Sequence, residues 1–286
     1  MKRPWKLVVI SWLCAGVPDA HAEERWIAIG GDITAIVAEL DADAPLVARD
    51  DTSLYPPSVA ELPSVGYLRQ LSAESVLSLS PTRILTNQYA GPEEVLEQLD
   101  AVGVRLDIIQ SPHHLNAIAD KVRDVARRIG QPAAGGALAQ RIEQQLDTLA
   151  SQPHLPATQA AFLLSHSGVT PRLAGAGTGA HTMLEAVGLN NAFAEMQGYQ
   201  AVGAEALARQ APELIIVSQR GLEAIGGEEA LWALPGMALT PAGKHKRLIL
   251  IDDQALLGFG PRAPEQLLEL RAELDRLLNA EGSASI

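Results

Sequence analysis

Short apolar runs, of the length of buried β-strands, alternate along the chain with longer segments whose apolar residues recur at helical spacing. The predicted strands cover residues 26–32, 46–48, 83–86, 104–109, 160–166, 214–219 and 248–252. The clearest predicted helices between them cover residues 73–79, 92–101 and 264–278. Because this alternation is typical of parallel sheets covered by helices, the sequence predicts an α/β fold.

Two long amphipathic segments, residues 115–129 and 133–150, interrupt the alternation in the middle of the chain. We therefore expect two α/β lobes with parallel-type sheets, at 23–131 and 153–286, joined by one long connecting helix at 132–152. A ligand cleft is expected between the lobes. A helical joint is stiffer than flexible strands, so it predicts a clamp that closes only slightly.

Each half of the chain carries a related stretch, GYLRQLSAESVLSLSPTRIL at 66–85 and GYQAVGAEALARQAPELIIV at 198–217. Both have a Gly-Tyr, a glutamate six or seven residues after the tyrosine, and a proline seven residues after the glutamate. The two glutamates, Glu74 and Glu205, are 131 residues apart. A solenoid repeat has a period of about 20–50 residues, so this doublet indicates two similar lobes with matched acidic positions. The alternative is two unrelated helix starts, where the dipole favours acidic residues.

The first 22 residues differ from the rest of the chain. Three cations precede an apolar stretch at 7–16, and the small-x-small site Ala20-His21-Ala22 follows it. This order predicts a cleaved secretory signal over residues 1–22, with a buried N-terminal helix as the alternative.

Cys14 is the only cysteine and lies inside that segment, so the mature chain would have no disulfide, catalytic thiol or thiolate metal site. Residues 1–22 carry three cations and one anion, so their removal takes the formal net charge from −12 to −14. Because nucleic-acid binding needs a basic face, this charge argues against it. An exported acidic chain with no other apolar segment of spanning length fits a bacterial periplasm.

The sequence contains no Walker A, G-x-S-x-G or H-E-x-x-H motif. Ser165-His166-Ser167 puts hydroxyls beside an imidazole, but adjacent residues do not give the geometry of a nucleophile and its base. None of these motifs therefore indicates an enzyme. A periplasmic hydrolase that uses His166 remains the alternative of another class.

Tyr67 and Arg69 lie two residues apart in the first matched stretch. In an extended segment their side chains would point to the same side. A guanidinium near a phenol stabilises the phenolate, and a tyrosine oxygen ligates haem iron in some proteins. The alternative is that Tyr67 packs a loop and Arg69 faces solvent.

Three further positions carry candidate ligand contacts. His166 ends a predicted strand at its carboxyl end, where α/β folds place ligand sites, and it is either a metal ligand or a loop hydrogen-bonder. Tyr55 in DTSLYPP is another candidate, with stacking on proline as its alternative. The His113-His114 pair is interpreted as the entry to a helix.

Six stretches spread over nearly the whole predicted mature chain carry a family resemblance: ERWIAIGGDITAI, ARDDTSLYP, LPSVGYLRQLSAESVLSLSPT, GPEEVLEQL, LSHSGVTPRLAG and LPGMALTPAGKHKRLILIDDQALLGFGPR. On these stretches the chain resembles the periplasmic haem-binding proteins of bacterial haem ABC importers, within the helical-hinge class of substrate-binding proteins. Siderophore and cobalamin binders share the two-lobe fold, and VGYLRQLSAE and PGMALTPAGKHKRL resemble the haem group.

The resemblance implies that Tyr67, in the GY-x-R motif, is the axial ligand of haem iron, with Arg69 as the matching arginine. It implies that His166 is a candidate ligand from the opposite lobe, in a family where some members hold a second, stacked haem. Tyr55 is a weaker ligand candidate. Glu74 and Glu205 are expected to pair with arginines on the two permease subunits.

The resemblance therefore implies a monomeric periplasmic carrier, not an enzyme, that captures haem, its transported ligand, and delivers it to an inner-membrane ABC permease dimer. No nucleic acid or direct membrane insertion is expected. A siderophore or cobalamin carrier of the same fold is the nearest alternative.

Overall fold

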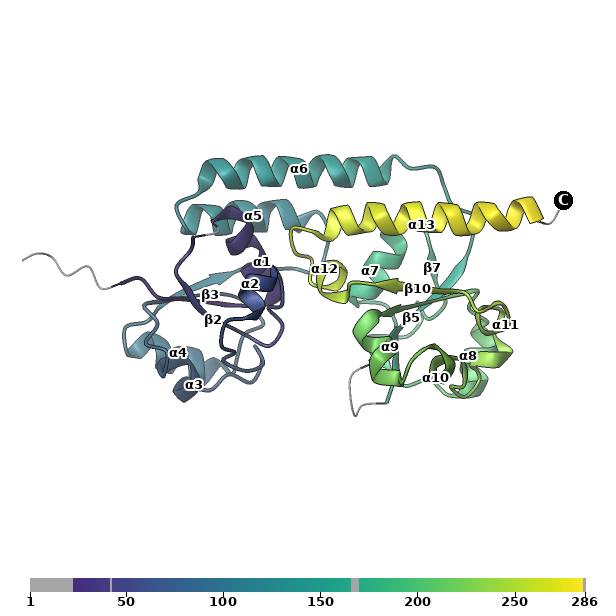
Figure 1. Cartoon of the computed structure of the whole chain (residues 1–286), viewed down its shortest axis with the longest axis horizontal. Coiled ribbons are helices and arrows are strands. Elements are labelled where there is room, and N and C mark those ends of the chain that lie inside the picture. The colour runs from purple at the N-terminus through teal and green to yellow at the C-terminus, as the bar shows by residue number, and fades with distance from the viewer. Residues whose placement is uncertain (1–22, 42, 166–169, 285–286) are drawn as a thin grey trace, which may run out of the picture.

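The computed structural model describes residues 23–41, 43–165 and 170–284. Within them the chain forms two α/β lobes side by side, as the sequence predicts, with the long helix α6 (Pro132–Ala150) running above both (Figure 1). In the described residues, no helix is long and apolar enough to cross a membrane.

The N-terminal lobe is built on a four-stranded sheet in the order β2-β1-β3-β4, and every pairing in it is parallel. Its strands are β1 (Trp26–Ile29), β2 (Leu46–Arg49), β3 (Arg83–Asn87) and β4 (Arg105–Ile109). All residues of β1 and β3 are buried, because helices or loops cover both faces of the sheet.

Two apolar clusters sandwich this sheet. One face packs against α1 (Gly31–Leu40), α5 (Ala117–Arg128) and α6. The other packs against the loop around Leu68 and the short helices α3 (Ala73–Leu77) and α4 (Glu93–Ala101). The remaining helix of this lobe, α2, spans Pro57–Ala60.

The C-terminal lobe has a six-stranded sheet that is mixed rather than wholly parallel. Its central strands β10 (Leu248–Ile251), β9 (Leu214–Ser218) and β5 (Gln159–Leu164) are parallel to one another. The short strand β6 (Arg172–Ala174) runs antiparallel to β5, and β8 (Tyr199–Gln200) antiparallel to β6. β7 (Asn190–Asn191) pairs with β5 in parallel. Strands of two or three residues carry no readable apolar pattern, so the sequence does not predict them.

Helices also cover both faces of the second sheet. The face on the side of α6 packs on α7 (Gly179–Ala186), α12 (Asp253–Leu257) and the final helix α13 (Ala263–Ala284). The opposite face packs on five short elements: α8 (Ala204–Gln210), α9 (Gln219–Ile225), α10 (Glu228–Trp232), the 3-10 turn Met237–Leu239 and α11 (Pro241–His245).

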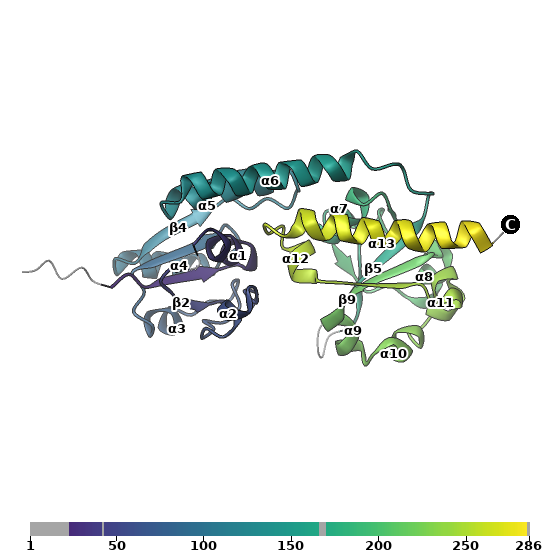
Figure 2. The ribbon, with the colours of Figure 1, turned by 45° about the horizontal axis from the view of Figure 1, so that its top comes forward.

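Helix α6 is one of two links between the lobes. It lies along α5 and then crosses towards the C-terminal lobe, and the view in Figure 2 shows it above α13. The second link is the segment between α12 and α13, which reaches back to the N-terminal lobe. There Phe259 and Ala263 join the apolar cluster of α1, α5 and α6, and the Lys121 Nζ donates to the Phe259 carbonyl over 2.8 Å.

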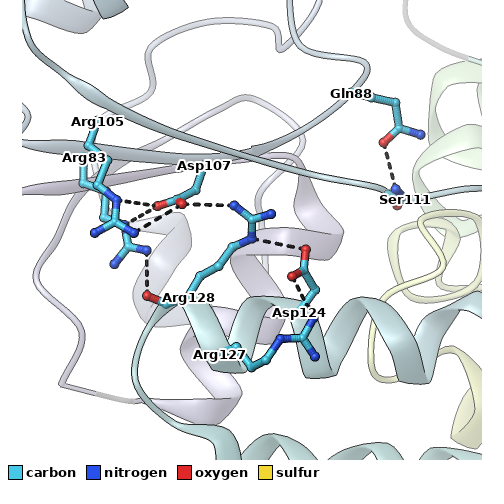
Figure 3. Close-up of polar contacts among 8 residues, drawn as sticks. All are labelled: Arg83, Gln88, Arg105, Asp107, Ser111, Asp124, Arg127 and Arg128. Atoms are coloured by element: carbon cyan, nitrogen blue, oxygen red, sulfur yellow. Dashed lines mark hydrogen bonds and ion pairs between the residues drawn. The ribbon is translucent and has the colours of Figure 1, made fainter.

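A cluster of ionised side chains fixes α5 to the sheet at the edge where β3 and β4 begin (Figure 3). Asp107 accepts from Arg83 Nε at 2.6 Å and from Arg128 Nη1 at 3.1 Å, and Arg105 Nε lies 3.3 Å away. Burial alone would raise the pKa of Asp107, but the hydrogen bonds and charges of Arg83, Arg128 and Arg105 outweigh it and lower that pKa. This network lies away from the carboxyl ends of the strands, so it is a support for the lobe and not part of the ligand site.

Candidate functional site

A cleft of about 520 Å³ lies between the two lobes and takes its walls from both. Its volume is in the range of small-molecule sites. The lining residues come from the N-terminal lobe, from the C-terminal lobe and from the second link between them: Gly30, Gly31, Asp32, Asp51, Thr52, Leu68, Arg69, Asn87, Tyr89, Ser111, His113, Ser165, Arg220, Ala224, Gln254, Leu257 and Gly258.

The N-terminal wall forms where the parallel strands end. Asp32, Asn87 and Ser111 lie at or just beyond the carboxyl ends of β1, β3 and β4, the edge where α/β folds bind ligands. Gly30 has a φ of +99°, which only glycine adopts readily, and a Cβ there would lie 2.7 Å from the Asn87 amide nitrogen. The glycine therefore lets the turn after β1 pass close to β3.

A buried ion pair forms the base of this wall. The Lys121 Nζ donates to Asp32 Oδ2 at 2.7 Å and to the Ser111 hydroxyl at 2.8 Å, and the Asn87 amide donates to Asp32 Oδ1 at 3.1 Å. Burial alone would raise the pKa of Asp32, but the Lys121 charge and these hydrogen bonds outweigh it, so that pKa lies below its usual value. The wall therefore holds a carboxylate that is already neutralised by the protein.

Planar side chains stand in sequence along the same wall. The Arg69 guanidinium carbon lies 5.6 Å from the centre of the Tyr89 ring. The Tyr89 and His113 ring centres are 4.8 Å apart and tilted by 31°. His113 in turn stacks on Phe259, with 5.7 Å between centres and 15° between planes. The cleft therefore has an aromatic wall with the Arg69 guanidinium at one end of it.

The pKa of the His113 imidazole is lowered, although the residue as a whole is exposed. Partial burial of the ring is the first cause; the Lys121 and Arg69 charges act in the same direction and the Asp32 carboxylate opposes them. Neither ring nitrogen of His113 makes a hydrogen bond within the described part of the chain.

The C-terminal lobe contributes a smaller and more polar wall. Ser165 follows β5 directly and is buried, while Arg220 and Ala224 come from α9. Arg220 therefore enters the same cleft as Arg69 from the opposite lobe. Two guanidinium groups facing one cavity from both sides suit a ligand with two carboxylates, because arginine binds carboxylates through paired hydrogen bonds.

Tyr67 is not among the described residues that line the cleft. Its side chain is 41% exposed, and the next two residues, Leu68 and Arg69, line the cavity. The segment is not extended, because the Gln70 amide donates to the Tyr67 carbonyl at 2.8 Å and closes a turn. The turn buries Leu68 against the sheet, so Tyr67 and Arg69 are not placed as neighbours on one side of a strand.

Tyr55 is not among the described residues that line the cleft. Its ring lies beneath the Arg262 guanidinium, 3.7 Å from the carbon to the ring centre, and both residues border a separate small pocket. Tyr55 thus supports the second link between the lobes. His166 lies outside the described residues, directly after Ser165 in the chain.

Glu74 and Glu205 occupy equivalent places in the two lobes. Each is the second residue of a short helix, α3 and α8, and each is exposed. Both helices cover the sheet faces that point away from α6 and α13 (Figure 1). Neither glutamate is among the described residues that line the cleft.

Sequence reasoning missed His113, Tyr89 and Arg220 as cleft residues. The position of a residue just beyond a predicted strand was a usable signal for Tyr89 and for Arg220, which follow β3 and β9 by two residues. No local signal was available for His113, because its ring is placed by Tyr89 and Phe259, residues distant in the sequence.

Solved structures with the same fold include haem-binding proteins. RhuT, the periplasmic haem-binding protein of Roseiflexus sp. RS-1, superposes with a TM-score of 0.83 at 36% identity, over 88% of this chain and 97% of that one. BhuT, solved in complex with two haems, superposes with a TM-score of 0.82 at 35% identity, over 89% of this chain and 99% of that one. HutB of Vibrio cholerae superposes with a TM-score of 0.78 at 30% identity, over 88% of this chain and 98% of that one.

A curated relative has a different ligand in its name. The vitamin B12-binding protein of Yersinia pestis (strain Pestoides F) is 27% identical over 204 residues, which is 70% of this chain and 71% of the relative. Residues 27–255 match the family described as periplasmic binding protein, a span that includes all of both sheets but Trp26 and every residue of the cleft lining but Leu257 and Gly258. The chain belongs to the periplasmic binding protein family.

Proposed function

We propose that this protein binds haem in the periplasm and delivers it to an inner-membrane ABC permease. The observation that carries the proposal is the composition of the cleft: an aromatic wall made by Tyr89 and His113, with Arg69 and Arg220 entering from opposite lobes. Haem is a flat apolar ring with two carboxylates, so it needs aromatic contact along its faces and cations at its edge. The solved relatives named for haem binding support the same ligand.

Tyr67 is the proposed axial ligand of the iron. It is exposed, and the two residues that follow it line the cleft, so its phenol oxygen is accessible to a metal. Ferric iron accepts a tyrosine oxygen as its protein ligand in known haem proteins. His166 is proposed as a ligand from the C-terminal lobe, because it follows the cleft residue Ser165 directly in the chain. Tyr55 is a weaker candidate, since Arg262 already covers its ring.

Glu74 and Glu205 are proposed to dock the loaded protein on its permease. Their matched positions on α3 and α8 suit a partner made of two similar subunits with basic residues at the contact. Charges at an interface act mainly on encounter rate and orientation, so these residues would serve delivery and not capture.

The proposed site of action is the periplasm, with residues 1–22 acting as an export signal that is removed. The protein would act there as a monomer and without catalytic turnover. Its family and solved relatives are binding proteins, which supports a role in capture.

Cobalamin is the second candidate ligand, because a vitamin B12-binding protein is among the relatives. One experiment separates the two. Purified protein is titrated with hemin and, in parallel, with cyanocobalamin, and binding is followed by absorbance and by calorimetry. We expect saturable hemin binding with a tyrosinate-type Soret band and no cobalamin binding. Cobalamin binding without hemin binding would make the proposal wrong.

A further inference from the structure

The N-terminal sheet ends in a strand with a free edge. β4 is the last strand of that sheet and, within the described residues, pairs with β3 alone. The Arg105 amide donates to the Thr82 carbonyl at 3.2 Å, so the backbone groups of Arg105 point towards β3. Because these groups alternate in direction along a parallel strand, those of Leu106 and Ile108 point outward, away from the sheet.

A groove of about 720 Å³ lies beside this edge, between β4 and α4 (Figure 2). Leu96 from α4 and Leu106 and Ile108 from β4 give it an apolar floor, and the Ile108 side chain is 41% exposed. The groove therefore combines unused backbone hydrogen-bonding groups with apolar surface that no other described element covers.

The rim of the groove is acidic. Glu93, Glu97 and Asp100 line it, at spacings of four and three residues that place them on one face of α4. All three are exposed, and none forms an ion pair within the described residues. No cation is among the described residues of the lining. The three carboxylates span about 10 Å of helix and β4 spans about 16 Å, so one short extended segment can meet both.

Other sheet edges are different. The outer edge of β2 is closed by residues 63–65 of the chain itself. β10 is a free edge like β4, but the groove of about 410 Å³ beside it is lined by the cation Arg276 as well as by Glu269 and Glu273. A free edge beside unpaired carboxylates without a cation thus distinguishes the groove at β4.

We propose that the groove at β4 binds a short extended segment of a partner protein, in which lysine or arginine occupies every second position. The segment would add to β4 as a further strand and bond the outward backbone groups of Leu106 and Ile108. Alternate side chains of a strand face the same way, so its cations would all lie on the side of α4. Their aliphatic stems would cover the apolar floor while their charged ends reach Glu93, Glu97 and Asp100. This interaction goes beyond the proposed capture of haem and does not depend on it.

The probe for the test is an acetylated and amidated octapeptide of alternating threonine and lysine, titrated into the purified protein by calorimetry at low ionic strength. Glu93→Gln/Glu97→Gln/Asp100→Asn removes the charges of the rim. Ile108→Pro removes one outward amide, at an edge position where a sheet tolerates proline. Thermal unfolding confirms that each variant is folded.

The groove at β10 supplies matched controls. Glu269→Gln/Glu273→Gln removes carboxylates there, and Leu250→Pro places proline on the other free edge, where the Arg247 carbonyl accepts from the Ile215 amide and the Leu250 groups therefore point outward.

Two modified peptides test the backbone pairing without any change to the protein. One is N-methylated at every lysine and the other at every threonine. Because only every second amide of an added strand faces β4, one of the two should lose binding and the other should keep it.

We expect saturable binding of one octapeptide by the wild type. The triple variant and Ile108→Pro should each weaken it at least tenfold, and both β10 controls should stay within twofold of the wild type. No binding by the wild type would overturn the inference, and the carboxylates would then only guard the edge against pairing. Equal losses in the β10 controls would also overturn it, since they indicate general attraction between charges.

Strand addition itself would be refuted if both methylated peptides bound as tightly as the parent. Sedimentation of the protein alone tests a second copy of the chain as the occupant. Self-association that Ile108→Pro abolishes would replace the foreign partner with that second copy and overturn the proposal.

Discussion

Asp32 and Lys121 form an ion pair of 2.7 Å in which the two side chains are 5% and 1% exposed. They lie 89 residues apart, and Lys121 also donates to the Phe259 carbonyl, so the pair ties α1, α5 and the second link together at the base of the cleft. Removing one member of a buried pair leaves the other charge without compensation, which typically costs about 3–5 kcal/mol.

Asp32→Asn should therefore lower the free energy of unfolding by about 3 kcal/mol or more, measured by chemical denaturation at neutral pH. The double change Asp32→Asn/Lys121→Met removes both charges and should cost much less than the single change. A double variant as unstable as Asp32→Asn would show that the loss does not come from the unpaired lysine.

The same pair predicts a pH dependence. The pKa of Asp32 is lowered in the folded protein, so between the ordinary value of 3.8 and the folded value the unfolded chain binds more protons. The contribution of Asp32 to stability is thus complete above about pH 4 and is lost as the pH falls through the folded pKa. Denaturation curves from pH 7 to pH 2.5 should show a shallower acid loss for Asp32→Asn than for the wild type. An equal loss of stability with falling pH in the wild type and in Asp32→Asn would contradict this.

Tyr67→Phe should weaken hemin binding by tenfold or more, equivalent to about 1.4 kcal/mol, and should change the Soret band, because only the ligating oxygen is removed. Tyr55→Phe is the matched control, since Tyr55 lies under Arg262 and outside the lining. Absorbance titrations compare the two. If Tyr55→Phe abolished the spectrum and Tyr67→Phe preserved it, the ligand assignment would be reversed.

Arg69→Ala and Arg220→Ala should each reduce hemin affinity by roughly 10- to 100-fold, because a hydrogen bond to a charged group contributes about 1.5–3 kcal/mol. The diagnostic comparison is with hemin dimethyl ester. Its affinity should change little in either variant, since it has no carboxylate to lose contact with. Arg209→Ala, on α8, serves as the control. Equal losses for the acid and the ester would assign the arginines a packing role.

Glu74→Lys/Glu205→Lys should leave hemin affinity nearly unchanged and stop transfer of haem into vesicles that contain the permease, with the single changes intermediate. Both residues are exposed and outside the cleft, which is why capture should survive. Glu273→Lys on α13, on the other side of the molecule, controls for charge reversal. Transfer by the double variant at the wild-type rate would refute the docking role.

The architecture was largely predictable because it rests on long apolar runs. The strands β1, β4, β9 and β10 fall within predicted segments, and β2, β3 and β5 each extend one residue beyond theirs. Helix α6 fills the predicted connecting position. The antiparallel strands β6 and β8 were not predicted, because strands of two or three residues are too short to show an alternation of apolar and polar positions.

The cleft was less predictable, because distant residues place its side chains. Lys121 lies in a segment predicted as an amphipathic helix, where a lysine is expected to face water. Its burial is explained by acceptors far away in the sequence, chiefly Asp32, 89 residues away, and the Phe259 carbonyl. The turn at Tyr67 likewise depends on Leu68 packing against the sheet. Glu74 and Glu205, by contrast, were recognisable from sequence as a pair, because local helix starts fix their places.

The two links between the lobes restrict how the molecule can move. A body attached to another at one point can swing and twist freely, but attachment at two separated points leaves a single axis of rotation, the line through both. Helix α6 and the segment around Phe259 are such points. Opening should therefore be a rotation of one lobe about this single axis. Arg69 and Arg220 would then separate along one arc and return to the same facing position each time a ligand leaves.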